Sequence, residues 1–463
     1  MRRIAKKATA AALASVMVIA AGSQLSAAAL ENKTDKPLAK NVIVMISDGW
    51  GYNQIAATDY YQYGKLGTQV YESFPFQMGM STYSVGSYDP SAAWDSFDYL
   101  KLMPTDSAAA ATAMSTGEKT YDAAIGVDDD GSVLRHISED LEAAGKATGV
   151  VSSVEFSHAT PAGFVAHNAS RNNYSEIANE MLKYSATDVI IGAGNPFYND
   201  NGDIKTSVSE SGYKYVGGST TWNSLADGTL DVSDANGDGI ADELDNWTLI
   251  QEKSEFEALQ TGETPSRLVG VPQVATTLQQ ARSGDGKADP YAVPLNDNVP
   301  DLATITNVAL NVLDNDEDGF FLMIEGGAVD WAGHANQSGR VIEEQMDFNK
   351  AVEAVNAWVR ENSNWGETLL IVTGDHETGY LTGPASGTES DPMWMSIVNN
   401  GAGVLPGMEW NSGNHTNSII PLYAKGDAAR LLKSYADESD PVRGSYIDNT
   451  EITELVRQAM NIR

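Results

Sequence analysis

The chain has 463 residues, which is enough for one large α/β domain or for two to three smaller domains. It carries 63 Asp and Glu against 29 Lys and Arg, and the formal net charge of −34 argues against nucleic acid or an anionic membrane as a partner. The absence of cysteine excludes disulfide bonds and zinc-thiolate sites.

Residues 1–29 have the pattern of an export signal. Four basic residues lie within residues 1–7, an apolar run covers residues 8–21, and residues 27–29 are alanines suited to cleavage. The apolar run falls short of the about 20 residues that a membrane-spanning helix needs. We therefore expect cleavage near Leu30, a mature chain of residues 30–463, and a periplasmic or secreted location without a membrane span. Retention of residues 1–29 as an uncleaved anchor is the alternative.

Six short apolar runs predict buried strands, at residues 41–47, 148–154, 188–191, 320–324, 369–373 and 419–424. Helical patterns lie between them, at residues 137–144, 175–184, 302–313 and 341–361. This alternation predicts an α/β fold with a central, mostly parallel sheet flanked by helices on both faces. Functional sites in such sheets form at the carboxyl ends of the strands, where this chain places many of its acidic and histidine residues.

Two stretches interrupt the alternation of strands and helices. Residues 196–290 are rich in Gly, Ser, Asp, Asn and Trp, and residues 383–413 form an irregular stretch just ahead of His415. We interpret both stretches as surface insertions on one catalytic domain of residues 30–463, not as separate domains.

Ser107 stands in the segment MPTDSAAAAT, residues 103–112. The Pro-Thr-Asp before it is a helix-start signal and the alanines after it are strong helix formers, so Ser107 is expected in the first turn of a helix. Backbone N–H groups and the positive dipole end at that position suit an anion such as phosphate. The simpler interpretation is that Asp106 or Ser107 only caps the helix.

Four of the six histidines lie in tight polar clusters, and these are His158, His334, His376 and His415. Asp330 and His334 are four residues apart, so one helical turn places both on the same face. Asp375 adjoins His376, and Glu325 ends a predicted strand. Histidine and carboxylate ligands without cysteine suit zinc or a similar metal, and an all-oxygen set suits magnesium. For any single histidine, a partly exposed residue without a metal is the simpler interpretation.

Six motifs of the chain resemble those of the alkaline phosphatase family, in the same order and at suitable spacing. They are MISDGWG, TDSAAAATA, HATPAGFVAHNASR, MIEGGAVDWAGHANQ, GDHETGY and GNHTNSIIPLYAKG. The resemblance covers the mature chain apart from the two insertions. It implies the fold described above and an alkaline phosphatase that hydrolyses small-molecule phosphate monoesters to an alcohol and inorganic phosphate. It also implies a homodimer.

The resemblance further implies roles for individual residues. Ser107 would attack phosphorus and become phosphoserine, while Arg171 clamps the phosphate and Asp106 orients the arginine. Two zinc ions and one magnesium ion are implied, with these ligands: Asp330, His334 and His415 for the first zinc; Asp48, Asp375 and His376 for the second; and Asp48, Thr160 and Glu325, with His158 nearby, for the magnesium-type site.

Two positions depart from the best-known enteric pattern of the family. His158 stands where that branch has aspartate, which leaves the third metal open: a histidine there could favour zinc or act through a bound water. Trp331 stands where that branch has lysine. Because Trp331 lacks the positive charge, we expect phosphate to bind less tightly and product inhibition to be weaker than in a Trp331→Lys variant.

A candidate calcium loop lies in the first insertion, with coordinating spacing around Gly239. Its expected ligands are Asp234, Asn236, Asp238, Asp242 and Asp245. The alternative is an acidic, glycine-rich surface loop without a bound ion. A similar spacing in residues 314–325 is interpreted as a turn followed by a buried strand, because an EF-hand needs a helix there.

Three other functions remain as alternatives to phosphomonoester hydrolysis. A phosphodiesterase or a sulfatase would reuse the same metal scaffold, although sulfatases need a modified Cys or Ser in another motif and phosphodiesterases usually use threonine. Ser107 in TDSAAAATA therefore disfavours both. A calcium-stabilised extracellular binding protein would explain the acidic charge and the calcium loop, but it leaves the histidine clusters unexplained.

Overall fold

The computed structural model describes residues 37–232 and 246–462. The expected export signal and the candidate calcium loop lie outside these described residues. Among the helices of the described ranges, none combines the length and apolar character needed to span a membrane.

Within the described residues, the chain forms an 11-stranded sheet in the order β14-β15-β2-β13-β8-β1-β7-β3-β4-β6-β5. Seven neighbouring strands are parallel: β8 (Thr368–Thr373), β1 (Asn41–Ser47), β7 (Phe320–Gly326), β3 (Ala147–Glu155), β4 (Val189–Ala193), β6 (Arg267–Gly270) and β5 (Trp247–Ile250). Four more complete one edge: β13 (Ile420–Lys425), β2 (Phe76–Ser81), β15 (Gly444–Asp448) and β14 (Glu438–Asp440). β13 is antiparallel to both β8 and β2, so the sheet is mostly, not wholly, parallel.

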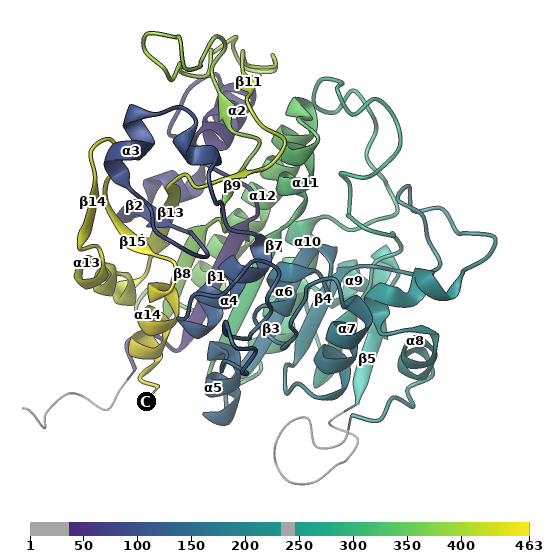
Figure 1. Ribbon diagram of the computed structural model, residues 1–463. Helices are drawn as coiled ribbons and strands as arrows, with labels where there is room; N and C mark the ends of the chain where they lie inside the picture. Colours follow the sequence, from purple (N-terminus) through teal and green to yellow (C-terminus); the bar gives the residue numbers. More distant parts are fainter. Residues whose placement is uncertain (1–36, 233–245, 463) are drawn as a thin grey trace, which may run out of the picture. The chain divides into compact units, whose positions relative to one another are not determined.

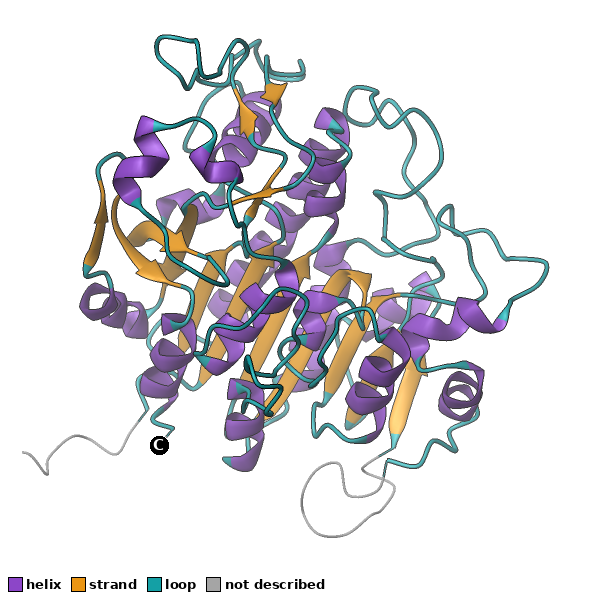
Figure 2. Ribbon diagram, viewed as in Figure 1, coloured by secondary structure: helices purple, strands orange, loops and turns teal. Residues whose placement is uncertain are grey.

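Helices cover both faces of the sheet, as Figures 1 and 2 show. One face packs against α4 (Ser107–Thr116), α5 (Ile137–Ala143), α6 (Ala159–Ala162), α7 (Tyr174–Lys183), α8 (Ser219–Ala226) and α14 (Glu451–Met460). The other packs against α2 (Tyr52–Tyr63), α9 (Lys253–Leu259), α10 (Leu302–Leu313) and α12 (Ser338–Asn362). Along β1, Val42, Val44 and Ile46 join the first core while Ile43 and Met45 join the second, as strand alternation requires.

The shorter elements connect these layers and surround the site. The α-helices are α3 (Pro90–Asp95), α11 (Ala328–His334) and α13 (Leu432–Tyr435), and the 3-10 helices are η1 (Val70–Ser73), η2 (Tyr99–Lys101), η3 (Glu210–Val216) and η5 (Asp427–Leu431). Two small two-stranded sheets pair β10 (Leu381–Thr382) with β11 (Glu409–Trp410) and β9 (Glu377–Thr378) with β12 (His415–Thr416).

The expected α/β fold with a mostly parallel sheet is confirmed. The structure differs from the expectation that residues 196–290 form a surface insertion. The described part of this stretch supplies β5 and β6 to the main sheet. These two strands are short and lie at the edge, so their four-residue patterns are hard to distinguish from loop sequence.

Candidate active site

The candidate site lies at the carboxyl ends of adjacent parallel strands. Asp48 directly follows β1, Asp375 and His376 follow β8, and Glu325 is near the end of β7. Because β8, β1 and β7 are neighbours in the sheet, their carboxyl ends bring these side chains together. Ser107 reaches the same edge as the first residue of α4.

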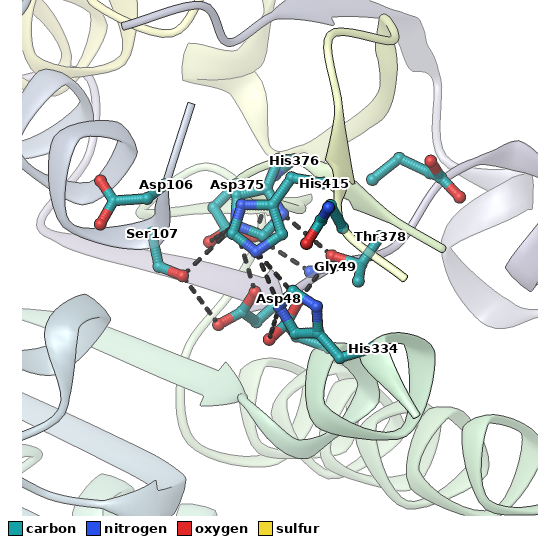
Figure 3. A network of polar contacts seen from close by, with 12 residues as sticks. Asp48, Gly49, Asp106, Ser107, His334, Asp375, His376, Thr378 and His415 are labelled. Carbon is teal, nitrogen blue, oxygen red and sulfur yellow. Dashed lines mark hydrogen bonds and ion pairs between the residues drawn. The ribbon is translucent and has the colours of Figure 1, made fainter. Parts of the chain in front are cut away.

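The start of α4 places the Ser107 hydroxyl. Asp106 is the N-cap, and its carboxylate accepts a hydrogen bond from the Ala109 N–H at 3.0 Å. Ser107 Oγ lies 3.4 Å from Asp48 Oδ2 and 3.3 Å from His376 Nε2 (Figure 3). The hydroxyl therefore sits at the positive end of a helix, in contact with one of the acid–histidine groups.

The first such group consists of Asp48, Asp375 and His376, whose side chains are almost completely buried. His376 Nε2 lies 3.2 Å from Asp375 Oδ2 and 3.7 Å from Asp48 Oδ1. Burial and the charge of Asp375 raise the pKa of Asp48 well above its usual range, and burial followed by the charge of Asp330 raises the pKa of Asp375 to about 6. Among the described residues, Asp48 Oδ1 and Asp375 Oδ2 are buried without a hydrogen-bond partner. These ligand types and unpartnered oxygens fit a metal cation.

The second group consists of Asp330 and His334 on α11 together with His415 on β12. The Nε2 atoms of His334 and His415 are 3.0 Å apart, and they lie 3.4 and 3.5 Å from the two oxygens of Asp330. The opposite ring nitrogens donate to carbonyls, His334 Nδ1 to Gly413 at 2.7 Å and His415 Nδ1 to Thr105 at 2.8 Å. Both Nε2 atoms therefore face the space beside Asp330, where each offers a lone pair to a metal cation once its proton is released.

The electrostatics of this second group follow from the histidine–aspartate contacts. Burial alone would lower the pKa of His415, but the hydrogen bond and charge of Asp330 outweigh it and raise the pKa to about 9. The His415 ring also stacks on His376 with 3.6 Å between ring centroids. The two groups therefore adjoin each other through their histidines.

A third set of unpartnered atoms comes from three residues outside these two groups. In the described part of the chain, Glu325 Oε1, Thr160 Oγ1 and His158 Nδ1 are buried without hydrogen-bond partners. Ser152 donates to the other oxygen of Glu325, and burial raises the pKa of that carboxyl to about 7. Glu325, Thr160 and the adjacent Asp48 supply only oxygen atoms, which fits a magnesium-type site.

Arg171 is the permanent cation beside Ser107. Its guanidinium donates to Asp106 Oδ2 at 2.9 Å and lies 3.3 Å from His158 Nε2. Burial would lower the pKa of Arg171, but the charge of Asp106 outweighs it and keeps the group cationic. Since Asp106 also caps α4, one carboxylate links the serine helix to the arginine.

These side chains surround an open cavity of about 430 Å³, which is lined by Ser107, His158, Arg171, Asp330, Trp331, His334 and His415. The remaining predicted metal ligands are more buried than the residues that line the cavity. They are Asp48, Thr160, Glu325, Asp375 and His376. All predicted site residues in the described ranges are thus brought to one edge of the sheet.

Sequence reasoning missed two residues at this site. Thr378 donates to Asp330 Oδ1 and lies 3.3 Å from His376 Nδ1, so it joins the two acid–histidine groups. The Tyr174 ring stacks on His158 at 6.3 Å. Thr378 belongs to the GDHETGY motif and could have been found there, whereas Tyr174 comes from a helix whose pattern gives no such signal.

The fold and the site together define a metal-dependent hydrolase built on a mostly parallel sheet, with two adjacent acid–histidine groups beside a serine. Residues 39–403 match the family model for alkaline phosphatase, so the chain belongs to the alkaline phosphatase family. The family is metal-dependent, and the protein is a phosphomonoesterase, which hydrolyses phosphate monoesters.

Similarity to individual relatives extends over most of the chain. Alkaline phosphatase 4 of Bacillus subtilis (strain 168) is 30% identical over 82% of this chain and 71% of its own length. Alkaline phosphatase of Escherichia coli (strain K12) is 29% identical over 90% of this chain and 87% of its own length. The solved alkaline phosphatase from the Antarctic bacterium TAB5 is 27% identical, covers 92% of this chain and 99% of its own, and has a TM-score of 0.61.

Proposed function

We propose that the protein hydrolyses phosphate monoesters through a phosphoserine on Ser107, with two zinc ions and one magnesium-type ion. The observation that carries this proposal is the position of the Ser107 side chain. Ser107 is the first residue of α4, and its Oγ contacts Asp48 and His376. A serine hydroxyl is almost fully protonated at neutral pH and needs such a setting to act as a nucleophile.

The chemistry requires two successive displacements at phosphorus. In the first, Ser107 Oγ forms a bond to phosphorus as the bond to the ester oxygen breaks, and the alcohol leaves with a proton. In the second, water attacks the phosphoserine, and inorganic phosphate leaves with the serine hydroxyl restored. Zinc ions, when bound, would supply Lewis acidity and a water that ionises near pH 7.

The residues of the chain bind and orient the phosphate. A planar guanidinium such as that of Arg171 can bind two phosphate oxygens at once, and its bond to Asp106 fixes its direction. The N–H groups at the start of α4 favour the same anion. His334 lines the cavity and is the most exposed of the proposed ligands, so the alcohol group is expected to leave on that side.

For the proposed ligands, Asp330, His334 and His415 would hold one zinc, and Asp48, Asp375 and His376 the other. Asp48, Thr160 and Glu325 would hold the third ion. His158 Nε2 accepts from Arg171, which places the ring proton on Nδ1 in the neutral imidazole. Burial, followed by the charge of Arg171, lowers the pKa of His158 to about 3 and keeps it neutral. We therefore assign His158 a contact through a bound water instead of direct ligation.

The identity of the third ion is part of this proposal. Two mutants of the TAB5 enzyme, in each of which an acidic residue replaces a histidine, are described with magnesium bound in the M3 site. By analogy, replacing the uncharged His158 with aspartate should strengthen magnesium binding in this protein, because a carboxylate is a preferred magnesium ligand.

The test of the proposed function uses chelated protein with zinc and magnesium added back. Release of phosphate from an aryl phosphate monoester at pH 7 to 10 should return with the metals and be lost in Ser107→Ala. Mass spectrometry after an acid quench should find covalent phosphate on the wild-type peptide only. Ser115→Ala, which removes another hydroxyl of α4, serves as the control.

Two outcomes would overturn the proposal. Retained turnover in Ser107→Ala would exclude the phosphoserine. Faster cleavage of a phosphate diester or a sulfate ester than of the monoester would favour the alternative activities of the superfamily.

We also propose export, a homodimer and a calcium loop. Export rests on the charge and hydropathy pattern of residues 1–29, and the homodimer rests on the family resemblance. The calcium loop at residues 234–245 rests on its spacing alone. Light scattering measures the dimer, and calorimetric titration with calcium, with Asp238→Ala as the control, tests the loop.

A further inference from the structure

The two acid–histidine groups differ in how the protein holds them. Asp48, Asp375 and His376 lie within three residues of the ends of central strands and are almost fully buried. Asp330 and His334 lie on α11, a seven-residue helix, and the His334 side chain is 39% exposed. The geometry of the second group therefore depends on whatever holds α11 in place.

A segment of residues 409–414 packs on α11, and we refer to it as the 409–414 segment. It begins with β11, which pairs with β10, and β10 in turn contacts α2. The Trp410 ring packs against a cluster formed by Val329 and Ala332 of α11 and Val341 of α12. Its Nε1 donates to Ser338 Oγ at the start of α12, at 2.9 Å.

The opposite side of Trp410 is also fixed. The ring packs against a second apolar cluster, which contains Ala57, Leu381 and Ile397. Trp410 therefore connects α2 and β10 on one side with α11 and α12 on the other, and its loss would remove apolar contacts on both sides.

Gly379 allows this close approach. Its φ is +91°, and a Cβ there would lie 2.4 Å from the Trp410 ring and 3.1 Å from the Gly333 carbonyl of α11. Its carbonyl accepts hydrogen bonds from the N–H groups of Asn411 and Ser412. The 409–414 segment is thereby tied to the chain that carries His376, three residues earlier.

The same segment contacts His334 directly. The Gly413 carbonyl accepts from His334 Nδ1 at 2.7 Å, so Nδ1 carries the proton and Nε2 keeps its lone pair. In the amide orientation that satisfies both ends, Asn336 donates to the Ser412 carbonyl at 2.9 Å and the Gly333 carbonyl at 3.0 Å. One segment therefore sets both the position of α11 and the tautomer of its histidine.

We propose that Trp410 and the 409–414 segment are positioning elements for the metal site of Asp330, His334 and His415. This inference rests on the proposed function, because it takes that group to bind a metal ion. Loss of the Trp410 packing frees α11 and loosens this site, whereas the site of Asp48, Asp375 and His376 is held by the sheet and stays unchanged.

The experiment measures metal affinity instead of activity. Metal-depleted protein is titrated with zinc by calorimetry, and cobalt spectra report the ligand geometry of each site. In Trp410→Ala, one site should weaken about tenfold or more while the others stay unchanged, because partners that orient a metal ligand are typically worth 10- to 100-fold in affinity. Trp410→Phe keeps much of the ring packing and should lie between Trp410→Ala and wild type.

Trp394→Ala is the matched control. Trp394 lies in the same irregular stretch, its Nε1 donates to the Tyr380 hydroxyl at 2.8 Å, and its ring packs on Trp94 of α3 and on Phe97, neither of which belongs to α11. Its loss should leave all metal affinities unchanged. If Trp410→Ala does not fold, Ser338→Ala removes only the indole hydrogen bond and should still weaken the same site.

The outcomes separate this inference from the proposed function. If His334→Ala binds as many zinc ions as the wild type, the group is no metal site and the proposed function is wrong. If His334→Ala loses an ion but Trp410→Ala keeps every affinity, only the positioning role is wrong. Equal weakening of all sites in Trp410→Ala also overturns the inference, since it would indicate general loosening.

Discussion

Asp106 has both of the roles considered for its motif, because it caps α4 and also orients Arg171. One carboxylate oxygen accepts from the N–H groups of Ala109 and Ala123, each at 3.0 Å, as a helix cap and turn stabiliser would. The other accepts from Arg171. Capping and orientation of the cation are therefore compatible, and the cap preference of aspartate is no argument against a role at the site.

Trp331 leads to a prediction about phosphate release. Its neutral ring lines the cavity and lies 5.6 Å from His158, so Arg171 is the permanent cation among the described residues of the lining. Trp331→Lys should add a second cation and strengthen inhibition by phosphate about tenfold, which corresponds to about 1.4 kcal/mol. Steady-state inhibition constants measure this change, and Trp331→Phe serves as a control without added charge. Equal constants for wild type and Trp331→Lys would contradict the prediction.

The contact between α4 and α6 links the helix of Ser107 to the helix of Thr160, a proposed ligand of the third ion. A Cβ at Gly163, which follows α6, would lie 2.6 Å from the Ala111 Cβ of α4. Gly163→Ala should therefore cost about 1–3 kcal/mol of unfolding free energy through overpacking, measured by urea denaturation. The double variant Ala111→Gly with Gly163→Ala should recover part of this loss, less about 1 kcal/mol for a helical glycine. No recovery would show that the clash is not the cause.

The elements that the sequence predicts well are those determined by local pattern. Residues 41–47 form β1 and residues 302–313 form α10, with the predicted bounds. Asp330 and His334 lie on a helix, as their four-residue spacing indicates. These features follow from periodicity within one segment, which a single sequence displays.

Other elements depend on contacts between distant segments and were not predictable in this way. α2 has little amphipathic pattern, since its buried positions include Gln54, Thr58 and Asp59. The contacts of Trp410 with α11 join residues about 80 positions apart, and no local pattern shows such a pairing. The candidate site was predictable by residue type and motif, whereas the parts that hold it in place were not.

The whole molecule buries several acids far from the site, and Glu344 on α12 gives the clearest consequence. Burial, followed by the charges of Asp347 and Glu343, raises its pKa to about 8, although Arg282 and Arg340 act in the opposite direction. A carboxyl with a raised folded-state pKa binds its proton more tightly in the folded protein. The carboxyl of Glu344 therefore lowers the free energy of unfolding as it loses its proton. This loss of stability is absent below the pKa of Glu344 in the unfolded chain and grows as the pH rises toward about 8.

Glu344→Gln should remove this pH dependence. At pH 8.5 the variant should melt a few degrees higher than the wild type, and at pH 4.5 the two should coincide, because one pKa unit corresponds to about 1.4 kcal/mol. Calorimetric melting of metal-loaded protein at both pH values measures the difference. Exposed Glu389→Gln is the control, and a Glu344→Gln effect that does not change with pH would contradict the assignment.

The dense packing behind Ser107 also bears on how the enzyme could acquire new substrates. Ala108, Ala110 and Ala111 are at most 1% exposed, so any larger side chain on that face of α4 would displace the nucleophile. Trp331 and His334, by contrast, stand at the partly exposed wall of the cavity. Variant libraries that aim to broaden the range of accepted alcohols should therefore sample Trp331 and the surface beside α11, and leave the alanines of α4 unchanged.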